Sequence, residues 1–197
     1  WVAGGWLAAG RGPTASSVQS VGSVQAGGGQ HGRKAGEKAG NMIEVLWHGR
    51  GGQGAFTAAR LLGAAASLAE GRFALAFPSF GPERRGAPMR AFTKLDDRPI
   101  GDRSASSQAD FVVYLDETLL GCAWESELKP GGKVLVNSTR HHGDPRVLSV
   151  DANGISASVL GRPIPNTAFL GALAALSGRV DVEDVREAVR LYMPDRK

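Results

Sequence analysis

The segment from Leu46 to Ala66, LWHGRGGQGAFTAARLLGAAA, decides the fold. An apolar run leads into a glycine-rich stretch, and a long series of Ala and Leu comes after it. The pattern predicts a strand over residues 43–48, a turn over 49–54 and a buried helix over 56–69. Glycines allow a tight turn and close approach of a ligand, and the free N–H groups that begin a helix favour an anion. The segment therefore predicts either a phosphate site or close packing of the helix on a sheet.

Strand and helix patterns alternate along the rest of the chain. Further strands are expected at 72–77, 89–95, 109–116, 133–138 and 146–151, and further helices at about 117–128, 153–161, 165–178 and 181–193. Residues 77–88 and the KPGGK stretch (129–133) are expected as loop and turn. Gly161 is a candidate C-cap, and Asn166 or Thr167 a candidate N-cap. The alternation predicts an α/β fold, a three-layer α/β/α domain with a largely parallel, mixed sheet and a Rossmann-like first βα unit. The 89–95 strand, with one polar face, is expected to be an edge strand or an antiparallel member.

Residues 1–41 differ from the remainder. They are rich in Gly, Ala and Ser, and they show no apolar periodicity. Such a composition buries too little surface to offset the entropy of ordering. We expect a disordered or mistranslated extension, with a targeting peptide as the alternative, followed by one domain over 42–197. No stretch is long and apolar enough for a membrane span.

The net charge and the cysteine content argue against several classes of function. The first 41 residues hold four Lys or Arg and one Glu of a chain with net charge +4, so residues 42–197 keep about +1. The basic character therefore gives no support to a nucleic-acid partner. Cys122 is the single cysteine, which excludes an internal disulfide and a cluster bound by four local thiolates. A reducing cytoplasm is the expected setting.

The residues after the glycine loop indicate which kinds of phosphate ligand the loop is unsuited to bind. A dinucleotide site requires an acidic residue about 20 positions on, at the end of the second strand, and residues 72–77 have none. There is no G-K-[ST] sequence for a P-loop. Arg84 and Arg85 in the next Pro- and Gly-rich loop are suited to clamp a phosphate or a carboxylate; otherwise they form a solvated surface or pair with Glu83. His48 is expected to be structural, with ligand contact as the alternative.

No catalytic constellation can be assembled from the remaining polar residues. The pair His141-His142 has no further ligand at metal-binding spacing. Asn137 and Ser138 close a strand at the end where open α/β sheets bind ligands, although Asn also commonly begins a turn. The residues alone thus indicate a ligand-binding α/β domain.

Five stretches together resemble a known family: WHGRGGQGAFTAARLLGAAA (47–66), AFPSFGPERRGAPMRAFTKLDDRPI (76–100), ADFVVYLDETLL (109–120), LKPGGKVLVNS (128–138) and LGRPIPNTAFLGAL (160–173). They are similar to the gamma subunit or gamma domain of pyruvate:ferredoxin and related 2-oxoacid:acceptor oxidoreductases. The order GRGGQG followed by FPSFGPERRGAP is the most specific part. Ala76 stands where the family often has Gln, and Ala109 where it often has Pro. The family also runs about one helix further, so the chain is expected to be short at its C-terminus.

The resemblance implies one subunit of a cytoplasmic, multi-chain oxidoreductase. Such enzymes decarboxylate a 2-oxoacid, with pyruvate preferred here, pass electrons to ferredoxin and form an acyl-coenzyme A. It places thiamine diphosphate and the [4Fe-4S] clusters on partner chains among the alpha, beta and delta subunits. It also implies that this chain has no catalytic residue or metal ligand of its own and helps to hold coenzyme A. The candidate phosphate-binding residues are Gly49, Arg50, Gly51, Gly52, Gln53, Gly54, Thr57, Arg84 and Arg85.

Two alternatives stay open. One is a purely structural interface subunit, in which the glycine loop serves only packing. The other is a stand-alone dinucleotide-binding protein, which the missing acidic residue disfavours.

Overall fold

A computed structural model describes residues 18–19, 42–79 and 85–193 of the 197-residue chain. Its strands are β1 (Val18–Gln19), β2 (Ile43–Arg50), β3 (Phe73–Pro78), β4 (Pro88–Asp96), β5 (Ala109–Tyr114), β6 (Leu128–Asn137) and β7 (Val147–Val150). Its helices are α1 (Ala55–Ala66), α2 (Ala152–Leu160), α3 (Asn166–Ser177) and α4 (Val182–Tyr192), with two short 3₁₀ helices, η1 (Glu117–Leu119) and η2 (Trp124–Glu127). The predicted domain boundary at residue 42 and the predicted extension before it fall almost wholly outside the described residues.

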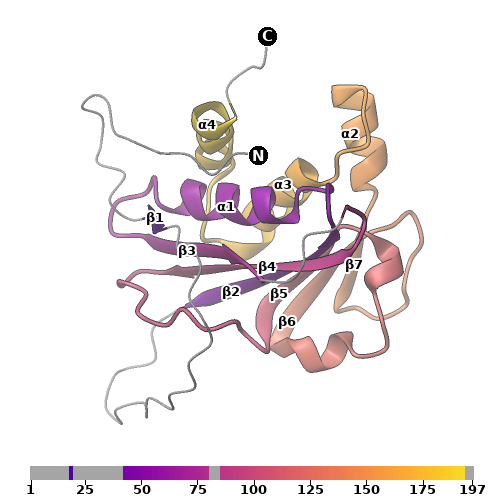
Figure 1. The fold of residues 1–197 in the computed structure, drawn as a ribbon, viewed down its shortest axis with the longest axis horizontal. Helices are drawn as coiled ribbons and strands as arrows, with labels where there is room; N and C mark the ends of the chain where they lie inside the picture. The colour runs from indigo at the N-terminus through magenta and orange to yellow at the C-terminus, as the bar shows by residue number, and fades with distance from the viewer. Residues whose placement is uncertain (1–17, 20–41, 80–84, 194–197) are drawn as a thin grey trace.

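One mixed sheet organises the molecule (Figure 1), in the order β1-β3-β4-β2-β5-β6-β7. Strands β2, β5, β6 and β7 are parallel neighbours, whereas β4 is antiparallel to both β2 and β3. The predicted α/β class, the largely parallel mixed sheet and the first βα unit, β2 followed by α1, are confirmed. The 89–95 segment is an antiparallel member as predicted, but it lies inside the sheet and not at its edge.

The two faces of the sheet are covered differently. Helices α1, α3 and α4 lie over one face (Figure 1), where Trp47, Leu62 and Phe169 are fully buried. On the other face, the apolar side chains of the sheet are packed by Leu119, Leu120 and Trp124 from the η1–η2 region. The second outer layer in the described residues is thus built of 3₁₀ turns and loop.

The predicted α-helix over 117–128 is wrong. Two 3₁₀ turns lie there, separated by residues 120–123, and β6 already begins at Leu128. The KPGGK stretch, predicted to be a turn, forms the first half of β6, and the ladder register shifts opposite it between Ala109 and Phe111. Asp116 accepts the N–H of Thr118 at the start of this connection, and Gly121 in its middle disfavours a continuous helix, so the chain crosses in two short 3₁₀ turns.

Helix ends agree only partly with the sequence-based expectation. Gly161 adopts φ 67° as the C-cap of α2, as expected. The N-cap of α3 is Pro165 and not Asn166 or Thr167, which already belong to its first turn, where the Asn166 side chain accepts the N–H of Thr167. The longest described helices, α1 and α3, have 12 residues each, and no helix in the described part combines the length and apolarity needed to cross a bilayer.

Candidate phosphate site at the start of the first helix

The glycine loop is shorter than the sequence indicated. Gly49 and Arg50 continue β2, so only residues 51–54 connect the strand to α1. The Gly51 N–H donates to Ala87 O at 2.9 Å, and the Gly86 N–H donates to Gly51 O at 3.1 Å. These two bonds fasten the loop to the segment that leads into β4.

The first turn of α1 presents backbone N–H groups that the helix itself does not pair. Because the first intrahelical bond runs from Ala58 N–H to Gly54 O, the N–H groups of Ala55, Phe56 and Thr57 have no partner within the helix. No acidic side chain occupies this turn, and no side chain caps it. The positive end of the helix dipole is therefore left available to an anion.

This turn opens into a cavity of about 860 Å³. Its walls come from the loop and first turn of α1, from the end of β3, and from Arg85 and the start of β4. The lining residues that bear on the chemistry are Gly51, Gly52, Gly54, Thr57, Arg85 and Arg90, together with His48. Two guanidinium groups and a helix N-terminus around one cavity favour a phosphate or another multiply charged anion.

Arg50 and Gln53 bond other parts of the chain. The Arg50 Nε donates to Asp116 Oδ2 at 2.9 Å, and its NH2 group donates to Thr118 Oγ1 at 2.9 Å. Gln53 donates to the same Asp116 oxygen at 3.2 Å, and its own amide oxygen accepts the Arg50 N–H at 2.7 Å. Burial alone would raise the pKa of Asp116, but the hydrogen bonds from Thr118, Gln53 and Arg50 hold it below its usual value. These two side chains join the loop to the end of β5.

The glycines have separate structural reasons. A Cβ at Gly54, which has φ 80°, would lie 2.5 Å from the Asn166 amide nitrogen. A Cβ at Gly49 would lie 3.0 Å from Ala55 Cβ. Gly52, with φ 101°, has no neighbour within 4 Å of such a Cβ, so only its backbone conformation calls for glycine there. Close packing therefore explains Gly49 and Gly54, while Gly52 faces open space.

Five of the nine predicted residues line the cavity: Gly51, Gly52, Gly54, Thr57 and Arg85. Gly49, Arg50 and Gln53 are not among the lining residues, and the last two hold the loop through Asp116. Arg84 lies outside the described residues. No sequence pattern pointed to Arg90. The ladder pairs this residue with His48, which was expected to be structural.

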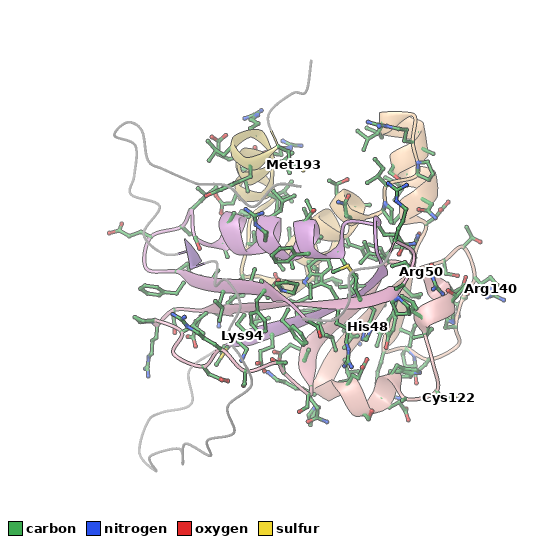
Figure 2. All side chains as sticks on the ribbon, in the orientation of Figure 1. His48, Arg50, Lys94, Cys122, Arg140 and Met193 are labelled. Atoms are coloured by element: carbon green, nitrogen blue, oxygen red, sulfur yellow. The ribbon has the colours of Figure 1, made fainter. Side chains whose placement is uncertain are left out.

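His48 is held firmly at the wall of the cavity. Its Nε2 lies 2.8 Å from Glu127 Oε2, and the Tyr114 hydroxyl donates to the same oxygen at 2.9 Å. The imidazole stacks on the Tyr114 ring with centroids 4.5 Å apart and planes 4° apart. Arg90 NH1 lies 3.8 Å from the other Glu127 oxygen. Figure 2 shows His48 and Arg50 near the same end of the sheet.

The carboxylate of Glu127 is the centre of this cluster. Burial raises the pKa of its carboxyl, but the hydrogen bonds with His48 and Tyr114 and the nearby Arg90 together bring it below the ordinary value. Burial and the same carboxylate raise the pKa of Tyr114 well above its usual range. Tyr114 is therefore a neutral donor, and Glu127 is an anion at neutral pH.

The described part of the chain contains no evident metal-binding site. No group of three or more His, Cys, Asp or Glu is placed to hold an ion there. His141 accepts the N–H of Gly143, and His142 Nε2 lies 3.6 Å from Glu117 Oε1. Cys122 is exposed, and one thiolate cannot hold an iron–sulfur cluster.

A model of the pyruvate ferredoxin/flavodoxin oxidoreductase family matches residues 44–197. The chain belongs to this family. The common gamma subunit of the pyruvate/ketoisovalerate oxidoreductases of Thermococcus kodakarensis is 46% identical to it over 159 residues, which are 76% of this chain and 85% of that one. The resemblance inferred from the motifs is thereby confirmed, and the chain is a gamma subunit of this oxidoreductase family.

Solved structures agree with this assignment for the gamma subunit. Pyruvate oxidoreductase subunit PORC from Thermotoga maritima superposes with a TM-score of 0.67 at 36% identity, covering 77% of this chain and 85% of that one. A 2-oxoglutarate:ferredoxin oxidoreductase from Magnetococcus marinus, solved with 2-oxoglutarate, coenzyme A and succinyl-CoA bound, gives a TM-score of 0.63 at 16% identity. That match covers 77% of this chain and 27% of the larger one, and it shows a shared fold.

Proposed function

We propose that this gamma subunit binds phosphate groups of coenzyme A inside an assembled 2-oxoacid:ferredoxin oxidoreductase, with pyruvate as the preferred 2-oxoacid. It supports oxidative decarboxylation to an acyl-coenzyme A and helps to hold the subunits together. The observation that carries the proposal is the uncapped first turn of α1, which opens into a cavity that Arg85 and Arg90 also line. The presence of coenzyme A in the M. marinus enzyme, which shares the fold, supports the choice of ligand.

The chemistry of the cavity suits a phosphate. The N–H groups of the first α1 turn donate to phosphate oxygens, and the exposed Thr57 hydroxyl adds a further donor. Gly51 and Gly52 place no side chain between the ligand and the backbone. Arg85 supplies a guanidinium that can contact two oxygens at once.

The remaining parts of the reaction belong to other chains in this proposal. Thiamine diphosphate supplies the carbanion chemistry and [4Fe-4S] clusters conduct electrons to ferredoxin, both held by the alpha, beta and delta partners. The single cysteine of this chain fits such a division. The complex is proposed to be cytoplasmic.

The test replaces Arg85 by Ala in the assembled complex. Removing a guanidinium from a phosphate is expected to raise the KM for coenzyme A by about tenfold or more, since a charge-assisted hydrogen bond contributes roughly 1.5–3 kcal/mol. The KM for pyruvate should stay the same. Arg186→Ala, which removes an exposed arginine of α4 paired with Glu183, is the matched control and should change neither constant. An unchanged KM for coenzyme A in Arg85→Ala would overturn the proposal.

A purely structural role is the second candidate, and one observation favours it. Arg50, Gln53 and Gly54 all contact other parts of the chain and fix the loop in place. That role predicts that Arg85→Ala lowers the yield of assembled complex and leaves coenzyme A saturation unchanged. A dinucleotide role is less suitable, because β4 separates β2 from β3 and no acidic residue occurs in β3.

A further inference from the structure

The bond to Glu127 decides what His48 can offer to a ligand. A carboxylate only accepts hydrogen bonds, so the hydrogen lies on His48 Nε2. Nδ1 is then the ring nitrogen left to meet a ligand in the cavity. It is an acceptor when the ring is neutral and a donor when the ring is protonated. A phosphate dianion also only accepts, so it can bond this nitrogen only in the imidazolium form.

The charges facing His48 come from four elements. Glu127 of η2 favours the imidazolium, and Tyr114 of β5 is neutral. Arg90 of β4, Arg85 before it and the N-terminus of α1 share the cavity and disfavour a further positive charge. An arriving phosphate adds negative charge among these groups and shifts the balance towards the protonated ring.

We propose that His48 binds a phosphate of the ligand through Nδ1 and takes up a proton from solvent as it does so, with Glu127 as the residue that positions the ring. This inference rests on the proposed function, because it takes coenzyme A as the ligand. No covalent bond forms or breaks. The phosphate is either the 3′-phosphate or the pyrophosphate of coenzyme A, which share this chemistry.

The test is calorimetric titration of the assembled complex with coenzyme A near pH 7.5, in two buffers of different ionisation enthalpy. The wild type is expected to take up more protons on binding than His48→Gln, by up to one per site. His48→Gln should also bind about tenfold more weakly, the loss of one charge-assisted hydrogen bond. Glu127→Gln should also weaken coenzyme A binding, as His48→Gln does, because a neutral amide cannot stabilise the imidazolium of His48. His141→Gln, in the exposed loop after β6, is the matched control. It should keep the wild-type affinity for coenzyme A and the wild-type proton uptake.

Dephospho-coenzyme A, which lacks the 3′-phosphate, separates the two sources of phosphate. If His48→Gln weakens coenzyme A but not dephospho-coenzyme A, the contact is with the 3′-phosphate. If it weakens both equally, the contact is with the pyrophosphate. Wild-type affinity and proton uptake in His48→Gln, with weakened binding in Arg85→Ala, would overturn this inference and leave the proposed function standing. Unchanged binding in both variants would overturn both.

Discussion

At the scale of single residues, Lys94 shows how ion pairs stabilise the face of the sheet that lies away from α1. It is 1% exposed, and its Nζ lies 2.9 Å from Asp102 and 3.3 Å from Glu44. Lys129 contacts Glu44 and Asp110, and Ser106 also donates to Glu44. A buried charge is tolerated only when it is paired in this way. On the polar face predicted for the 89–95 strand, Lys94 is therefore closed off by the 97–108 segment, whereas Arg90 stays exposed at the cavity.

The Asp102 ion pair predicts a pH-dependent stability. Burial raises the pKa of Asp102, but hydrogen bonds from Ser104 and Lys94 outweigh it and lower the pKa to about 2. Because the folded pKa lies below the unfolded value of 3.8, the stabilisation is complete above about pH 4 and is lost as the pH falls towards 2. Asp102→Asn should reduce the free energy of unfolding by about 1 kcal/mol at neutral pH, a value kept low because the aspartate side chain is half exposed. Urea unfolding at several pH values should show that difference shrinking between pH 4 and 2.

Asp144→Asn is the matched control for this prediction. Its carboxyl also has a pKa of about 2, lowered by hydrogen bonds from Arg146, but that arginine is 43% exposed and stays hydrated without its partner. Asp144→Asn should therefore lower the free energy of unfolding less than Asp102→Asn does. An equal or larger effect would show that the burial of Lys94 is not what makes the Asp102 pair important.

At the scale of elements, the junction of β2 and α1 combines packing with exposure of backbone donors. Gly54 lets α1 begin against Asn166, the first residue of α3, and Asn166 is itself buried. Arg50 and Gln53 fix the same junction to the end of β5 through Asp116. The result is a helix start that is rigid and uncapped, as an anion site requires.

Gly54→Ala should therefore be much more harmful than Gly71→Ala. Both glycines have positive φ, 80° and 71°, so both substitutions bear the same backbone strain of about 1–2 kcal/mol. A Cβ at Gly71 meets nothing within 4 Å, whereas a Cβ at Gly54 meets the Asn166 amide. We expect Gly54→Ala to lower the free energy of unfolding by roughly 2 kcal/mol more than Gly71→Ala. Thermal unfolding of the chain measures the difference.

The double variant Gly54→Ala/Asn166→Ala tests the cause. Removal of the amide takes away the nearest atom, so part of the extra loss should be recovered relative to Asn166→Ala alone. If the two substitutions are simply additive, the steric explanation for Gly54 is wrong.

At the scale of the whole molecule, the position of β4 creates the cavity. This strand enters the sheet antiparallel between β2 and β3, and its first residues, together with Arg85, form the wall opposite the start of α1. A fully parallel sheet would place another strand end there. The same strand brings Arg90 beside His48 through the ladder. The cavity thus depends on segments that lie some 40 residues apart in the sequence.

The proposed division of chemistry between subunits predicts that Cys122 is dispensable for iron binding. Since one exposed thiol cannot ligate a cluster, Cys122→Ser in the assembled complex should leave the iron content per complex unchanged. Elemental analysis of the purified complex measures it. A loss of iron in this variant would mean that the gamma subunit shares a cluster with a partner.

Local patterns in the sequence determined the first βα unit, most strands and the helices of the C-terminal half, because apolar periodicity and glycine placement act over a few residues. The motif order also determined the family. Only the tertiary structure decided that Arg50 and Gln53 bond Asp116, that Lys94 is buried among carboxylates, and that His48 shares the cavity with Arg85 and Arg90. These outcomes depend on strand order, and strand order results from packing the whole sheet rather than from any single segment.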